Sequence, residues 1–221
     1  MRLVFNLLLV FFIFSSTGAL SENLKKNYIL KAKGFVIGEV LWKIKFDKIF
    51  FETTLSLKST GLLSKIYSFE GEYTSSGFLK DKVFEPTKYS QKWITKKKRR
   101  DIEIVFKNFS PSKLVIIPEE TEKPRIDYKE IKNYKDPLSS FLNILINKRK
   151  SPTFDGRRVY LLVPKENEDQ ISIAIKEYKN VWADHKRNDL EYIKVLKFKK
   201  NILPNKIKIG FRGSEFTLIE Y

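Results

Sequence analysis

The chain has 221 residues, with 43 lysines and arginines against 26 aspartates and glutamates, so its formal net charge is +17 at pH 7. It contains no cysteine and one histidine, which excludes disulfides, a lipid-modified cysteine and zinc sites built from these residues. This length is sufficient for one substantial hydrophobic core, and no linker or internal repeat divides it.

Residues 1–19, MRLVFNLLLVFFIFSSTGA, have the pattern of a secretory signal peptide. A positive charge at Arg2 precedes an apolar run over Leu3–Phe14, and small residues lead to Ala19. An uncleaved membrane anchor is the alternative, but the run is shorter than the roughly 20 residues that a bilayer span needs. We therefore expect cleavage after Ala19 and a periplasmic protein with one β-rich domain over residues 20–221.

Alternating apolar and polar residues dominate the rest of the chain and predict β-strands. Four apolar residues share one strand face: Val40, Trp42, Ile44 and Phe46. The same alternation recurs at residues 102–106, 171–175 and 207–211. Further β-rich runs lie near residues 27–33, 49–60, 67–76, 82–94, 113–117, 157–163, 189–198 and 215–221. Hairpin turns are predicted at Asp47–Lys48 and at Ser76–Gly77.

A basic cluster, KKKRR at residues 96–100, lies between two predicted strands and indicates a hairpin tip. A solvated turn is one interpretation. Contact with an anionic membrane surface is the other, with Trp93 of the preceding strand as an interfacial anchor.

One segment, from Asp136 to about residue 147, predicts an α-helix. Asp136 is a suitable N-cap and Pro137 suits the first helical position. Apolar residues then recur at helical spacing: Leu138, Phe141, Leu142 and Leu145. Additional isoleucines widen the apolar arc, so the helix should be covered on more than one side. It either forms a lid over a ligand cavity or simply fills the core.

Together these elements predict a mainly β protein. About a dozen twisted antiparallel strands and one apolar helix favour a strongly curved sheet or an incomplete β-barrel, with the helix packed on the concave side.

The stretch FDGRRVY at residues 154–160 begins with a strong turn signal, Asp155–Gly156. Arg157 and Arg158 follow as adjacent strand residues, so their side chains should point to opposite faces. One interpretation is an ion pair with a carboxylate, and we expect Arg157 to fold back onto Asp155 or Asp136. The other is a contact with the phosphate of a ligand.

Evidence for catalysis or metal binding is weak. His185 lies in the polar run ADHKRND without a neighbouring nucleophile motif, which indicates an exposed loop. Glu119 and Glu120 lie between prolines in a predicted loop, and no EF-hand-like spacing is present. Nucleophile elbows and phosphate-binding glycine loops are also missing. We expect neither an enzyme, nor a metal site, nor a cofactor.

Four blocks of sequence carry a resemblance: GFVIGEVLWKI (34–44), STGLLSKIYSFEGEYTSSG (59–77), DPLSSFLNIL (136–145) and FDGRRVYLL (154–162). In this order they resemble the bacterial domain of unknown function family 3108. The resemblance implies an exported envelope protein with a β-rich fold and supplies no catalytic residues. More loosely, that fold is similar to the outer-membrane lipoprotein carriers, which hold acyl chains in a concave apolar face under a helix.

Two functions are consistent with these features. The first is a non-catalytic periplasmic protein that binds or carries a lipid or other amphiphile, with Arg157, Arg158, Phe141, Leu142, Leu145 and Trp93 as candidate contacts. The second is a structural or assembly factor that contacts envelope proteins and binds no small ligand. The positive charge favours anionic lipid headgroups and peripheral membrane contact over nucleic acid in this compartment. A lysine-rich solvated surface, with 34 lysines to 9 arginines, is the alternative.

Overall fold

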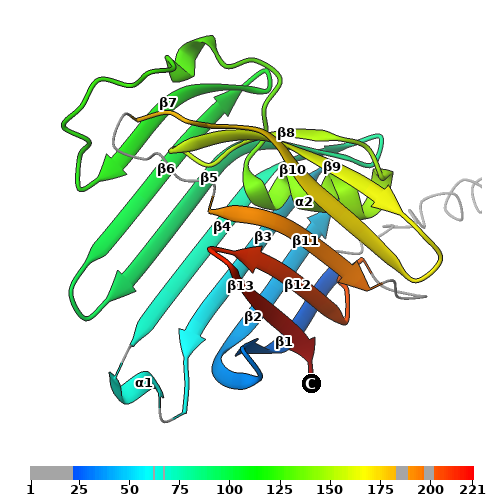
Figure 1. Ribbon diagram of the computed structural model, residues 1–221. Helices are drawn as coiled ribbons and strands as arrows, with labels where there is room; N and C mark the ends of the chain where they lie inside the picture. The colour runs from blue at the N-terminus through cyan, green and yellow to red at the C-terminus, as the bar shows by residue number, and fades with distance from the viewer. Residues whose placement is uncertain (1–21, 62, 67, 183–188, 197–201) are drawn as a thin grey trace, which may run out of the picture.

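The computed structural model describes residues 22–61, 63–66, 68–182, 189–196 and 202–221 (Figure 1). The predicted signal peptide and His185 lie outside these ranges. Within them the chain forms one sheet of 13 strands, in which all neighbouring pairs are antiparallel. The strands are β1 (Glu22–Ala32), β2 (Phe35–Asp47), β3 (Phe50–Ser59), β4 (Phe69–Lys80), β5 (Val83–Thr95), β6 (Arg99–Lys107), β7 (Ser110–Ile117), β8 (Ser151–Phe154), β9 (Arg158–Glu166), β10 (Gln170–Asn180), β11 (Leu190–Leu196), β12 (Lys206–Phe211) and β13 (Ser214–Glu220).

The sheet is a curved strip that does not close into a barrel. Its order is β7-β6-β5-β4-β3-β2-β1-β13-β12-β11-β10-β9-β8, so β7 and β8 form its two edges. β1 pairs with β2 on one side and with β13 on the other, and so joins two wings, β2–β7 and β8–β13. Figure 1 shows the wings curling toward each other around a central helix. No helix in the described ranges is long and apolar enough to cross a bilayer.

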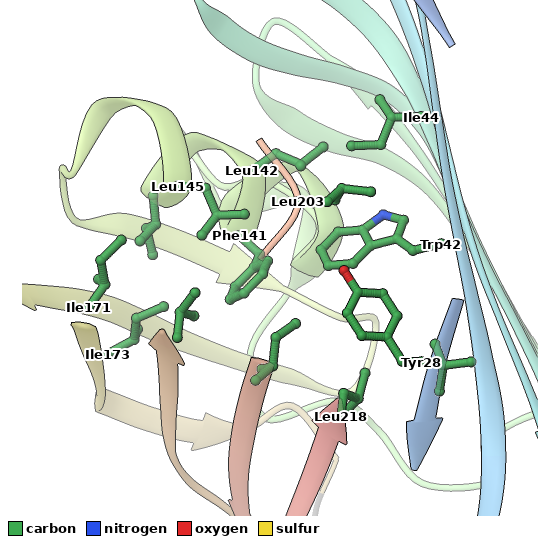
Figure 2. Close-up of a cluster of buried hydrophobic side chains, with 14 of the residues drawn as sticks. Tyr28, Trp42, Ile44, Phe141, Leu142, Leu145, Ile171, Ile173, Leu203 and Leu218 are labelled. Carbon is green, nitrogen blue, oxygen red and sulfur yellow. The ribbon is translucent and has the colours of Figure 1, made fainter. Parts of the chain in front are cut away.

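That helix, α2 (Pro137–Asn147), has the predicted bounds. All eight residues from Leu138 to Leu145 are buried, because the helix contacts β4 and β5 of one wing and β8 of the other. Figure 2 shows its apolar side chains between Trp42 on one wall and Ile171 and Ile173 on the other. The aromatic rings of Phe141 and Trp42 lie 5.7 Å apart.

This architecture confirms the predicted fold class: a mainly β, strongly curved antiparallel sheet with one apolar helix on its concave side. The hairpin turn at Asp47–Lys48 and the tip at residues 96–98 are also confirmed, with Arg99 and Arg100 beginning β6. The sequence patterns did not predict three short elements: β8, the helix α1 (Leu63–Ile66) and the 3-10 helix η1 (Tyr128–Glu130).

The turn predicted at Ser76–Gly77 is wrong, because both residues lie inside β4. The register shifts there, so that Ser76 pairs with Lys88 and Gly77 with Pro86. This irregularity requires a glycine: a Cβ on Gly77 would lie 2.0 Å from the carbonyl oxygen of Glu85. Serine and glycine are common in bulges as well as in turns, so the pair alone does not distinguish them.

Candidate functional site

The N-terminal cap of α2 anchors the helix to the concave side of the sheet. One carboxylate oxygen of Asp136 accepts hydrogen bonds from the backbone N–H groups of Leu138 (2.9 Å) and Ser139 (3.0 Å). The other accepts a 2.8 Å hydrogen bond from the Ser75 hydroxyl of β4. Burial raises the pKa of Asp136, while these hydrogen bonds favour the ionised carboxylate and oppose the rise.

A second polar anchor lies two turns along the helix. The Asn143 side chain accepts a hydrogen bond from the backbone N–H of Phe84 (3.0 Å) and donates one to the Phe84 carbonyl (2.9 Å). Near the end of α2, the Asn147 amide donates to the Lys82 carbonyl at 2.8 Å. The helix is therefore bonded along its length to β4, β5 and the hairpin between them.

Phe141, Leu142 and Leu145, the predicted ligand contacts of the helix, lie in the hydrophobic core. Leu142 is fully buried, and Phe141 and Leu145 retain only 8% and 6% of their exposure. Their neighbours are core side chains from both wings (Figure 2). This packing favours the helix as core filler over the helix as a lid.

Beyond the reach of α2, the concave face carries apolar side chains that are only half-buried. On β3, Leu57 pairs with the buried Val40, so it points inward, and on β5 Trp93 pairs with Gly71 on the same face. On the other wing, three inward side chains form one row across neighbouring strands: Ile193, Ile209 and Phe216. All five pack against the edge of the main core. We call these five residues the open strip.

Trp93 does not extend from the 96–98 tip toward solvent. Its ring stacks on Phe69, with centroids 5.4 Å apart and an interplanar angle of 10°. It also lies directly over Gly71, where a Cβ would come within 2.8 Å of the ring. Trp93 therefore belongs to the concave face and not to the hairpin tip, so its role as an interfacial anchor has no geometric support.

The Asp155–Gly156 turn is confirmed. Gly156 has a φ of +90°, and a Cβ there would lie 2.7 Å from the Ile102 side chain. One carboxylate oxygen of Asp155 accepts hydrogen bonds from the backbone N–H groups of Arg157 (2.9 Å) and Arg158 (2.7 Å). The turn therefore packs against β6 and also organises the start of β9.

The two arginines have different partners from those expected. Arg157 forms a 2.6 Å ion pair with Glu120, and both side chains are nearly buried. The predicted fold-back of the Arg157 side chain onto Asp155 or Asp136 is thus wrong. The reason is the loop after β7, whose position over this turn the local sequence could not indicate.

Arg158 is the arginine that pairs with Asp155, at 3.4 Å, and it also contacts Asp189 at 3.3 Å. Asp189 receives a second ion pair from Arg212 at 2.8 Å. Burial opposes the charge on Arg158, but the neighbouring acids outweigh it and raise the pKa of its guanidinium. Both arginines of the stretch are thus bonded to carboxylates, which favours the ion-pair interpretation.

Three tyrosines from both wings lie close to this turn: Tyr89 and Tyr160 are buried, and Tyr73 is partly buried. Burial, with Asp155 nearby, raises the pKa of Tyr73 to about 12, and burial raises the pKa values of Tyr89 and Tyr160 further. These phenols remain neutral at physiological pH. Together with the paired arginines they form a polar network in this part of the interior.

Glu120 thus acts in an ion pair, and no cluster of three potential metal ligands occurs among the residues that the structure describes. What the concave face offers to a ligand is the partly exposed apolar surface of the open strip. Alternation predicts that these five side chains point inward. It cannot predict that they remain half-exposed, because that depends on how far α2 extends across the sheet.

A family model described as "Protein of unknown function (DUF3108)" matches residues 27–199. The chain belongs to this family. Among solved structures, the DUF3108 chain is similar to the "Beta-barrel-like Protein of Domain of Unknown Function DUF1849 from Brucella abortus", with 8% identity and a TM-score of 0.52. That likeness covers 91% of this chain and 96% of the other, and it shows a shared fold. No curated protein matches the sequence.

Proposed function

We propose that this DUF3108 protein is an exported, non-catalytic envelope protein that binds a lipid or other amphiphile along the open strip of its concave face. The observation that carries the proposal is the half-burial of five inward-facing apolar side chains: Leu57, Trp93, Ile193, Ile209 and Phe216. The N-terminal sequence supports export, since residues 1–19 have the pattern of a signal peptide.

Physical chemistry favours an acyl chain or similar group in this place. Inward-facing side chains that remain in contact with water can still gain about 25 cal/mol for each Å² of apolar area that a ligand covers. Each methylene of a bound chain adds about 0.8 kcal/mol when it is buried. Leu57 and Trp93 lie on one wing and the three other residues on the opposite wing, so a chain between them would contact both.

The Asp155–Arg158 turn is not assigned to the ligand's headgroup. Arg157 and Arg158 each already contact carboxylates, so an anionic headgroup would have to compete with Glu120, Asp155 and Asp189. We therefore propose a site selected by apolar contact, and assign these arginines to the stability of the fold.

The second candidate, a structural or assembly factor without a small ligand, is favoured by one observation. The part of the concave side that α2 covers is filled by helix side chains, from Leu138 to Leu145. In a protein of this kind the open strip would be the edge of the hydrophobic core and would bind no ligand.

Native mass spectrometry of the protein purified gently from the periplasmic fraction distinguishes the two candidates. The amphiphile site predicts a co-purifying lipid mass. It also predicts that a fatty acid brominated in mid-chain quenches tryptophan fluorescence, and that Trp93→Phe removes most of this quenching although Trp42 and Trp182 remain.

Ile209→Asn tests the open strip directly, and we expect it to weaken binding of the brominated fatty acid about tenfold, since it replaces one apolar contact. Ile94→Asn is the matched control. It makes the same change next to Trp93 in β5, but on the convex face, where Ile94 is 43% exposed. Equal binding by the two variants, or no binding by the wild type, would contradict the proposal and leave the assembly factor.

A further inference from the structure

Three large apolar side chains are exposed at one end of the β2–β7 wing, where the β2–β3 and β4–β5 hairpins turn. Ile49 is 55% exposed, Phe50 49% and Phe78 40%. Phe50 and Phe78 are paired across β3 and β4, and their rings lie 5.1 Å apart. We call these three residues the hairpin-end patch. It lies on the convex side, since Phe51, the neighbour of Phe50, is the residue that points into the core.

The patch is continuous with two shallow hollows on the same surface. One lies over Phe50 and Phe78, and the other extends from Phe78 and Ile49 across to Phe109 in the β6–β7 hairpin. The two hollows share Phe78 and Thr87. Contiguous exposed apolar surface of this kind marks contact with another protein or with a membrane.

The charge around the patch indicates which partner it fits. Exposed cationic side chains in residues 45–52, 78–83, 106–110 and 147–150 are Lys45, Lys48, Lys80, Lys82, Lys107, Lys148, Arg149 and Lys150. Exposed carboxylates in the same ranges are Asp47, Glu52 and Asp81. The segment after α2 belongs to this end, because Asn147 is bonded to the Lys82 carbonyl in the β4–β5 hairpin.

We propose that the hairpin-end patch docks the protein onto an anionic lipid bilayer. Aromatic and aliphatic side chains enter the interface between headgroups and acyl chains, while surrounding lysines contact anionic headgroups. Long lysine stems allow the charge to stay at the headgroup level while the patch inserts. The excess of eight cationic over three anionic side chains fits a surface of uniform negative charge. This proposal does not depend on the amphiphile site of the concave face.

The proposal moves the membrane contact away from the KKKRR tip. That tip lies at the opposite end of the strands, and Trp93, the aromatic residue expected to anchor it, is turned into the concave face. At the hairpin-end patch, by contrast, exposed apolar and basic side chains lie together at one end of the wing.

Sedimentation with sucrose-loaded vesicles tests this docking, using the protein purified in its exported form. Vesicles of phosphatidylcholine with about 30% phosphatidylglycerol, an anionic lipid, should bind the protein, and the affinity should fall as the salt concentration rises. Phe78→Ser should weaken binding about tenfold and Lys80→Gln about fivefold. Both residues are exposed, and unchanged melting temperatures will show that the variants are folded.

Phe35→Ser is the matched control, because Phe35 is 71% exposed but lies at the opposite end of β2. It should leave vesicle binding unchanged. Three results would overturn the proposal: no binding of the wild type, equal binding to vesicles of pure phosphatidylcholine, or an equal loss in the Phe35 and Phe78 variants. Loss of vesicle binding in Phe78→Ser with fatty-acid quenching intact would separate this surface from the concave site.

Discussion

Replacing Phe141 with alanine measures whether α2 is core or lid. The phenyl ring is 8% exposed, it lies 5.7 Å from the Trp42 ring, and its neighbours are core residues of both wings. A buried aromatic side chain removes about 200 Å² from water, which at about 25 cal/mol per Å² corresponds to roughly 5 kcal/mol. Measured losses for Phe→Ala in cores are about 3 to 5 kcal/mol, and we expect a loss in this range.

Urea denaturation followed by tryptophan fluorescence gives the free energy of unfolding of Phe141→Ala and the wild type. For a domain of this size the expected loss lowers the melting temperature by about 6 to 20 °C. Phe35→Ala is the control, since its exposed ring should change stability by no more than about 0.5 kcal/mol. A loss below about 1 kcal/mol for Phe141→Ala would refute the core assignment and would restore the lid over a ligand cavity.

Two further predictions concern the Asp155–Arg158 turn and its tyrosines. Arg157→Ala and Arg158→Ala should each lower the free energy of unfolding by about 1 to 3 kcal/mol, because each removes an ion pair from a largely buried carboxylate. In the same urea titrations Arg99→Ala, which breaks a surface pair, should stay within about 0.5 kcal/mol, and two silent turn variants would disprove the structural role. Tyr73 has a folded-state pKa raised to about 12, so the folded protein retains a proton that the unfolded chain loses near pH 10. The free energy of unfolding should therefore fall between pH 10 and about 12, by about 3 kcal/mol from this group. Alkaline denaturation curves should show a smaller fall for Tyr73→Phe, and an equal fall in the variant and the wild type would mean that the pKa of this phenol is not raised.

The sequence patterns predicted those elements that are determined by residues close together in the chain. Alternation around Trp42 and Ile104 indicates inward faces, and both side chains are buried in the positions that their strands assign. The helix begins at Pro137 because Asp136 caps it, and the Asp155–Gly156 turn follows from the freedom of glycine at positive φ.

The same patterns could not predict contacts between residues that are far apart in the sequence. Arg157 meets Glu120 across 37 positions of sequence and Arg158 meets Asp189 across 31, and neither acid belongs to a motif. The open strip was equally hidden, because Ile173 and Ile193 are paired and have the same alternation, yet only Ile173 is fully buried. What separates them is coverage by other elements, which depends on the assembled fold.

The segment between β7 and α2 explains how an unclosed sheet keeps its two edges together. Its backbone bonds to three separate places: Arg125 N–H to the Val181 carbonyl after β10, Tyr134 N–H to the Phe109 carbonyl before β7, and Lys135 to β8 through Pro152 and Phe154. The Lys135 bonds cover one edge strand, and a covered edge is protected from pairing with another chain. The Glu120–Arg157 ion pair adds a link from the same segment to the start of β9.

Strand pairing is therefore not needed to join β7 to β8, and this has a consequence for the concave face. In a closed barrel of this kind the strands would surround the interior at both ends, whereas a strip joined by a connecting segment can leave one end uncovered. Helix α2 fills the end near the β4–β5 hairpin, where Asn147 bonds to Lys82. The opposite end keeps Leu57 and Phe216 half-buried. An apolar binding surface at that end would thus follow from the way in which the connecting segment links the two edges of the open sheet. Substitutions in this segment should lower the free energy of unfolding more than they alter the open strip.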